Sequence, residues 1–233
     1  MPTAFIAGAT GYTGRHLVRR LSDWGVDTVA HVRPDSPRLD QWRRRFGVHG
    51  ARVDATPWRE DALTATLARI SPGLVFAVLG TTRVRARRSG LEPEKAYLDV
   101  DYGLTTLLLR ATRRAAPSAR FIYLSAAGAG APRGAYMEAR ARAERDIQAS
   151  GLAHVIARPS FITGPDREER RPLERAAAAT LDAALAVAGR LGARRTRERY
   201  RSTDAATLAH ALVALAMDPA AGGVYESEAL RKG

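Results

Sequence analysis

Short apolar stretches alternate along this chain with longer stretches in which apolar residues recur every three or four positions. The short stretches predict strands at 3–7, 27–32, 48–53, 74–78, 120–124, 153–157 and 223–226. The longer stretches predict amphipathic helices at 12–22, 58–70, 94–116, 135–149, 173–190 and 204–217. Because strand and helix alternate, we expect an α/β protein with a doubly wound parallel sheet, which binds ligands at the carboxyl ends of its strands.

The length of the chain fits a single domain over residues 1–233. The loop-like, charged stretch 164–172 leads into a segment that we expect to form a small C-terminal helical cap over 167–203, with a solvent-exposed helical appendage as an equal alternative. No apolar run approaches the ~20 residues that cross a bilayer. The first strand begins too early for a signal peptide, and the chain has no cysteine. We therefore expect a cytoplasmic protein with no membrane partner.

One glycine-rich turn carries the clearest functional signal. The stretch Gly-Ala-Thr-Gly-Tyr-Thr-Gly follows the first predicted strand directly and opens the first predicted helix. Gly8 permits the tight turn, Gly11 lets the backbone approach a pyrophosphate, and Gly14 lets the helix pack closely on the strand. The N–H groups at the helix N-terminus would bind the phosphates. The candidate cofactor-binding residues of this turn are Gly8, Thr10, Gly11, Tyr12, Thr13 and Gly14.

The spacing of these glycines resembles that of the short-chain dehydrogenases/reductases in their extended and atypical branches. Residues 78–83, 99–102, 136 and 158–159 are similar to the atypical group that includes the human Tat-interacting protein and the NmrA-like regulators. The resemblance covers most of residues 3–166 and implies a Rossmann-type fold. It also implies that Asp54 and Ala55 contact adenine, although Asp54 has a helix-capping role as its alternative. The residues that the resemblance places at the ribose, the nicotinamide and the carboxamide are Leu79, Gly80, Thr81 and Pro159.

The end of the second predicted strand favours NADP(H) over NAD(H). A carboxylate at this position would accept hydrogen bonds from the ribose 2′-OH and repel a 2′-phosphate. Here the strand is followed by Arg33, whose planar guanidinium can pair with that phosphate. Asp35 could restore some NAD binding, and Arg33 could also be an ordinary surface residue.

The resemblance further implies a catalytic Ser after the fifth strand and a Tyr-x-x-x-Lys pair on the next helix. This chain has Tyr136 followed four residues later by Arg140, and it has Ser125 one position before Ala126, where relatives carry the catalytic Ser. Arg140 keeps a positive charge and donors for the ribose, but it cannot relay a proton as Lys can. We expect Tyr136, Arg140 and Ser125 to form the catalytic group. The alternatives are an ordinary helix position for Tyr136 and local backbone hydrogen bonding for Ser125.

The net charge of +13 comes almost entirely from arginine and would attract polyanions. No helix-turn-helix, zinc-finger or aromatic RNA-binding motif accompanies it, so we expect no specific nucleic-acid partner and interpret the arginine-rich run 194–201 as solvated surface. The four arginines of the loop 83–88 could attract an anionic substrate or the cofactor phosphates, or could be solvated as well. The five histidines have no metal-ligand spacing, and we expect no metal.

These observations predict an NADP(H)-binding oxidoreductase that transfers a hydride between the nicotinamide and a small carbonyl compound. The alternative is a catalytically impaired protein that senses NADP(H) and passes the signal to a protein partner. Ala126 and Arg140 favour the sensor, whereas Tyr136 favours the enzyme.

Overall fold

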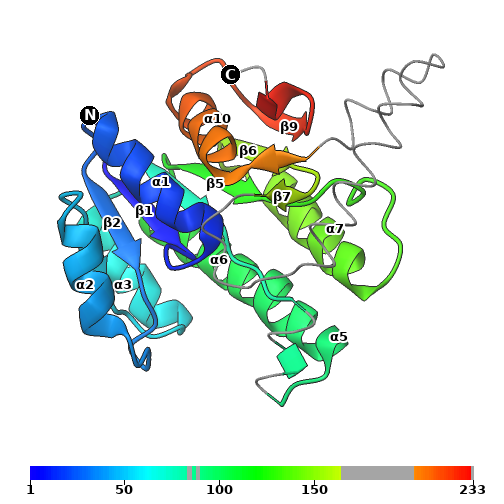
Figure 1. The fold of residues 1–233 in the computed structure, drawn as a ribbon, viewed down its shortest axis with the longest axis horizontal. Helices are drawn as coiled ribbons and strands as arrows, with labels where there is room; N and C mark the ends of the chain where they lie inside the picture. The colour runs from blue at the N-terminus through cyan, green and yellow to red at the C-terminus, as the bar shows by residue number, and fades with distance from the viewer. Residues whose placement is uncertain (83–85, 88–89, 164–201, 232–233) are drawn as a thin grey trace.

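The centre of the molecule is a parallel sheet of seven strands in the order β3-β2-β1-β4-β5-β6-β9 (Figure 1). The computed structural model describes residues 1–82, 86–87, 90–163 and 202–231. The strands are β1 Ala4–Ala7, β2 Thr28–His31, β3 Arg52–Asp54, β4 Leu74–Ala77, β5 Arg120–Leu124, β6 His154–Arg158 and β9 Gly223–Glu226. The strand order reverses between β1 and β4, so the predicted doubly wound Rossmann-type sheet is confirmed, and its switch point lies beside the glycine turn.

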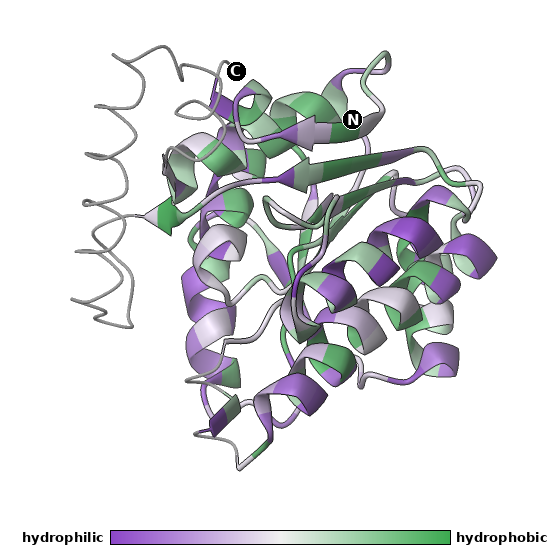
Figure 2. Ribbon diagram, turned by 90° about the vertical axis from the view of Figure 1, so that its right-hand side faces the viewer, coloured by the Kyte–Doolittle hydropathy of each residue, from purple (hydrophilic) through white to green (hydrophobic). Residues whose placement is uncertain are grey.

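Helices cover both faces of the sheet because successive strand residues point to opposite sides. On β1, Ile6 packs into one core with the helices α1 Tyr12–Asp23 and α10 Ala205–Met217, which lie side by side in Figure 1. Phe5 packs into a second core with α3 Glu60–Ile70, α6 Thr105–Ala115 and α7 Ala135–Gln148. Figure 2 shows the same division, with hydrophobic strands between helices that are hydrophilic on one side.

A helix that the hydrophobic pattern did not predict, α2 Leu39–Gly47, lies between β2 and β3. Its sequence has three consecutive arginines, and only Trp42 and Phe46 are buried. These two rings stack at 5.3 Å, one helical turn apart, and the guanidinium groups of Arg38 and Arg45 each lie 5.5 Å from the Trp42 ring centroid. Because the helix extends through 47 and a turn follows, β3 begins at Arg52 rather than at the predicted residue 48.

The long helix predicted over 94–116 forms in three parts with different geometry. A short α5 Pro93–Ala96 leads into a π-helical segment, η1 Tyr97–Leu104, which continues into α6. A π-helix is wider than an α-helix and is common at functional sites. Within η1 the Asp101 side chain is fully buried, and this segment packs against α7.

Two short strands complete the described structure. β7 Ile162–Thr163 pairs with β8 Thr203–Asp204 in a second sheet. β8 leads directly into α10, and the Asp204 carboxylate caps this helix by accepting hydrogen bonds from Ala206 N and Thr207 N. A 3₁₀ turn, η2 Ala229–Arg231, follows β9. The predicted helix 173–190, the arginine-rich run 194–201 and almost all of the expected cap 167–203 lie outside the described residues. Among the helices that are described, none has the length and apolar character to cross a membrane.

Candidate cofactor-binding and catalytic site

The glycine turn has the conformation that close packing requires. Gly8 has a φ of 89°, and a Cβ at this position would lie 2.6 Å from the carbonyl oxygen of Val78. A Cβ on Gly14 would lie 2.2 Å from the Gly8 carbonyl oxygen. Gly11 is the N-cap of α1 and has no side-chain cap, and the first turn of the helix contains no acidic residue. The N-terminus of α1 can therefore receive an anionic group.

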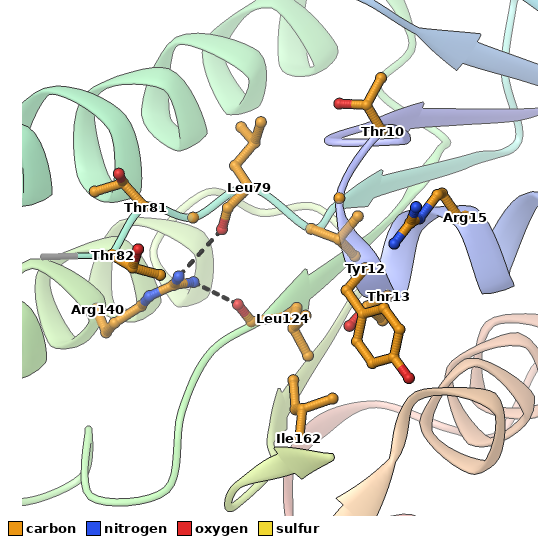
Figure 3. Close-up of a pocket in the computed structure, with 13 residues that line it drawn as sticks. Thr10, Tyr12, Thr13, Arg15, Leu79, Thr81, Thr82, Leu124, Arg140 and Ile162 are labelled. Carbon is orange, nitrogen blue, oxygen red and sulfur yellow. Dashed lines mark hydrogen bonds between the residues drawn. The ribbon is translucent and has the colours of Figure 1, made fainter. Parts of the chain in front are cut away.

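Two adjoining cavities lie at the carboxyl ends of the strands, on either side of this turn. Both are lined by Thr10, Gly11, Val78, Leu79, Gly80 and Thr81. The β5-side cavity, of about 170 Å³, is completed by Tyr12, Thr13, Arg15, Thr82, Leu124, Arg140 and Ile162 (Figure 3). The β2-side cavity, of about 500 Å³, is completed by Gly8, His31, Arg33, Trp58, Ala86, Leu91, Ala96, Val100 and Leu104. Because they share these six residues, the two cavities adjoin at the switch point of the sheet, and together they are called the groove below.

Most of the predicted cofactor residues line this groove. Gly8, Thr10, Gly11, Tyr12, Thr13, Arg33, Leu79, Gly80 and Thr81 each line one or both cavities. Gly14, Asp54, Ala55 and Pro159 line neither of them. Of the loop 83–88, only Ala86 and Arg87 lie in the described residues, so the expectation for its other arginines falls outside the described residues.

Arg140 is almost fully buried and joins the ends of two strands. Its Nη1 donates to the carbonyl oxygen of Leu124 at 2.6 Å, and its Nη2 donates to that of Leu79 at 3.1 Å (Figure 3). Nη2 also donates to Asp101 Oδ1 at 2.5 Å. The Nε atom has no hydrogen bond to a described residue. Both terminal nitrogens of Arg140 are therefore bound to protein atoms on β5, on η1 and in the loop that follows β4.

Asp101 was not singled out as a site residue, although it lies in one of the stretches that carry the resemblance. Its second oxygen accepts the backbone N–H of Thr81 at 3.1 Å, so the carboxylate connects Arg140 to the loop that separates the two cavities. Burial raises the pKa of the Asp101 carboxyl, and the Arg140 guanidinium and the Thr81 N–H act in the opposite direction. Asp101 lies within η1, and the helical periodicity alone does not reveal this π-helical segment.

Tyr136 lies on α7 next to Arg140. Its half-buried ring meets Tyr97 edge-on at 5.2 Å, and the Arg140 guanidinium carbon is 5.3 Å from its centroid. No hydrogen bond joins the Tyr136 hydroxyl to a residue that the structure describes. A second tyrosine, Tyr123, was not predicted here; burial raises its pKa to about 12, and its hydroxyl accepts from Arg140 Nη1 at 3.3 Å. Of these two tyrosines, Tyr136 is the one whose hydroxyl has no hydrogen bond to a described residue, and it lines neither cavity.

Ser125 is buried, and its hydroxyl points to a different partner. The hydroxyl donates to Glu144 Oε1 at 2.5 Å. Glu144 forms a two-point ion pair with Arg158, whose Nη1 also donates to Glu226 at 2.9 Å. Ser125 lines neither cavity, so its hydroxyl acts in the buried network that joins β5, α7, β6 and β9.

A family model described as NAD(P)H-binding matches residues 8–219. The chain belongs to this NAD(P)H-binding family. The residues that line the groove lie within the matched range, and the resemblance to the atypical short-chain dehydrogenases/reductases is confirmed.

The chain is similar in sequence to curated proteins and in fold to solved structures. Protein fmp52-1, mitochondrial, from Aspergillus terreus is 30% identical over 185 residues, which cover 76% of this chain and 73% of that protein. The Bordetella bronchiseptica enzyme WbmH, solved in complex with NAD⁺, is 15% identical and has a TM-score of 0.67. Its match covers 97% of this chain and 76% of the WbmH chain. AtPrR2, solved with NADP⁺ and (+)pinoresinol, is 16% identical and has a TM-score of 0.56. Its match covers 69% of this chain and 50% of the AtPrR2 chain.

Proposed function

We propose that this protein is an NADP(H)-dependent oxidoreductase that acts on a small carbonyl compound. The observation that carries the proposal is a pair of adjoining cavities that Arg33 lines on the β2 side and Arg140 lines on the β5 side. Tyr136 lines neither cavity, but its ring contacts the Arg140 guanidinium. The groove fits a dinucleotide, because the uncapped N-terminus of α1 suits a pyrophosphate. Gly80 lets Arg140 approach the groove, since a Cβ at this position would lie 2.6 Å from Arg140 Nη2.

The preference for NADP(H) rests on Arg33. Its side chain is 62% exposed, and its ion-pair partner among the described residues, Asp35, lies 3.8 Å away and is also exposed. Such an exposed pair contributes little, so the guanidinium can turn to a 2′-phosphate without a large cost. An Arg–phosphate pair should exceed the ~1.4 kcal/mol that corresponds to a tenfold difference in affinity.

Calorimetry tests this preference directly. NADPH should bind at least about tenfold more tightly than NADH, and Arg33→Ala should remove most of the difference. Arg43→Ala is the matched control, because Arg43 is an exposed arginine on α2 that pairs with Asp40 and lines neither cavity. Equal affinities for the two cofactors in the unaltered protein would contradict the assignment.

In the proposed reaction the bound nicotinamide supplies or accepts the hydride. Tyr136 holds the proton for the carbonyl oxygen, since its hydroxyl has no hydrogen bond to a described residue. Arg140, fixed by Asp101 and by two strand carbonyls, holds a permanent positive charge beside the Tyr136 ring and stabilises negative charge on the phenolic oxygen when the proton leaves. Ser125 does not contact the substrate in this proposal, and its hydroxyl holds Glu144 in the buried network beside the site.

An NADPH-oxidation screen against aldehydes, ketones and quinones tests the enzymatic function. Turnover should be found for at least one carbonyl class, and Tyr136→Phe should reduce it about 10²–10⁴-fold with little effect on NADPH affinity. Tyr97→Phe is the matched control, because it leaves the ring contact with Tyr136 in place. Turnover that survives Tyr136→Phe would assign the proton transfer to another group.

A second candidate function is an NADP(H) sensor that acts on a protein partner. It is favoured by the hydrogen bonding of Ser125 to Glu144 and of Arg140 to Asp101, because two of the three expected catalytic side chains are engaged within the protein. A sensor would bind NADPH and show negligible turnover in the same screen. We also propose a single domain and a cytoplasmic location for this protein. Cell fractionation decides the last against the mitochondrial name of the relatives.

A further inference from the structure

The β2-side cavity contains an aromatic residue that the sequence motifs did not indicate. Trp58 lies four residues beyond β3 and is half-buried at the edge of this cavity, which Arg33 and His31 also line. The remaining wall includes the aliphatic side chains of Val100 and Leu104 from η1. A flat aromatic surface and an aliphatic wall in one cavity suit a planar, largely apolar ring system.

We propose that Trp58 is the stacking surface for the adenine ring of the cofactor, and that Asp54, Thr56 and His31 act as positioning residues that hold its indole in place. The inference rests on the proposed binding of NADP(H). Stacking of a base on an aromatic side chain contributes substantially and needs no specific hydrogen bond, because every base presents a π-face.

The His31 ring contacts the indole of Trp58. The His31 ring meets the indole edge-to-face at 4.8 Å and 72°, and it also packs against Phe5 at 5.8 Å. Its Nε2 lies 2.8 Å from the carbonyl oxygen of Thr56. A carbonyl only accepts, so Nε2 carries the hydrogen, and this hydrogen bond fixes the rotation of the imidazole. The orientation of the indole edge is therefore set by the Thr56 carbonyl through His31.

Thr56 is in turn held by Asp54. The two carboxylate oxygens of Asp54 accept the Thr56 backbone N–H at 3.1 Å and the Thr56 hydroxyl at 3.0 Å. The Thr56 hydroxyl also lies 2.7 Å from that of Thr66 on α3. Both oxygens of Asp54 are thus bound within the turn after β3, and Asp54 lines neither cavity. The role of Asp54 toward adenine is to position this turn rather than to contact the base.

Intrinsic fluorescence provides a test that does not depend on activity. The chain has three tryptophans, and neither Trp24 nor Trp42 lines the groove. The probe is adenosine 2′,5′-bisphosphate, which has the adenine and the 2′-phosphate but no nicotinamide. It should quench the tryptophan emission of the unaltered protein and of Trp42→Phe. In Trp58→Phe most of the quenching should be lost, because the fluorophore next to the base is gone.

Affinity gives the second measurement. Trp58→Ala should weaken the binding of adenosine 2′,5′-bisphosphate about 5- to 140-fold, the range that corresponds to ~1–3 kcal/mol of stacking. Binding of reduced nicotinamide mononucleotide, which lacks adenine, should be unchanged. Trp58→Phe keeps an aromatic face and should retain most of the affinity, and it also serves as the variant to measure if Trp58→Ala does not fold.

The positioning role of His31 is tested by a double-mutant cycle. His31→Phe keeps the ring but cannot donate to Thr56, and it should weaken the bisphosphate without affecting the mononucleotide. In the Trp58→Ala background it should have no further effect, because its contribution passes through the indole. Additive losses would overturn the positioning role, and unchanged bisphosphate affinity in Trp58→Ala would overturn the stacking role. If the unaltered protein binds neither the bisphosphate nor NADPH, the proposed cofactor itself is wrong.

Discussion

The buried ion pair between Arg140 and Asp101 makes a demanding prediction. Asp101 has no exposed surface, and the Arg140 side chain is 6% exposed. Arg140→Met keeps an unbranched apolar stem but removes the guanidinium, and with it the charge and all its hydrogen bonds. The Asp101 carboxylate then remains buried without its cation, and the strand-end carbonyls of Leu79 and Leu124 lose a charged donor.

The structure indicates the size of the effect. Removal of one partner from a buried ion pair costs ~3–5 kcal/mol, and each buried carbonyl that loses its donor adds ~1–3 kcal/mol, although the losses do not add fully. We expect Arg140→Met to lower the free energy of unfolding by about 4 kcal/mol or more, out of a typical ~5–15 kcal/mol. Arg140→Lys keeps the charge but has all its donors on one atom, so it cannot reach two strands and Asp101 together. We expect it to cost about 1–3 kcal/mol.

Urea denaturation of the single and double variants measures these values. Asp101→Asn combined with Arg140→Met should destabilise less than the sum of the two single changes, by about 1–3 kcal/mol, because no buried charge is left unpaired. Arg145→Met, an exposed position on the same helix, should change stability by no more than about 0.5 kcal/mol. NADPH affinity should fall with Arg140→Lys, since Asp101 also holds the Thr81 loop of the groove. Full stability and full affinity in Arg140→Lys would refute this reasoning.

Two further predictions concern His31 and the glycine turn. Burial lowers the pKa of His31 below its ordinary value of 6.5, so the unfolded chain binds the proton more readily and stability should be lost as the pH falls below about 6.5. His31→Gln should flatten this part of the curve of unfolding free energy against pH. An identical pH dependence in the two proteins would contradict this expectation. Gly14→Ala should lower the free energy of unfolding by about 1–3 kcal/mol and weaken NADPH binding, because its Cβ would lie 2.2 Å from the Gly8 carbonyl oxygen. Gly47→Ala is the control, since the space around Gly47 is open, and it should change neither quantity. Denaturation measures the stability, and calorimetry measures the binding.

Local patterns in the sequence were sufficient for the framework of this protein. The seven strands of the main sheet each correspond to a short apolar run. The glycine turn was also predictable from local sequence, because the positive φ at Gly8 and the need for a small residue at Gly14 depend on residues close in the chain. Periodicity failed for α2, where three arginines interrupt the apolar positions and the helix is stabilised by a few contacts around Trp42.

Only the tertiary structure decided what the candidate catalytic side chains bind. Arg140 lies four residues after Tyr136, at the position that the sequence pattern predicts. Its partner Asp101 is 39 residues away and reaches it because η1 packs against α7. Ser125 pairs with Glu144, and His31 pairs with the Thr56 carbonyl, through contacts that no spacing along the chain encodes. Hydrogen bonds of buried polar groups depend on which elements pack together, so the sequence determined which residues reach the groove, and the packing determined what their polar atoms do there.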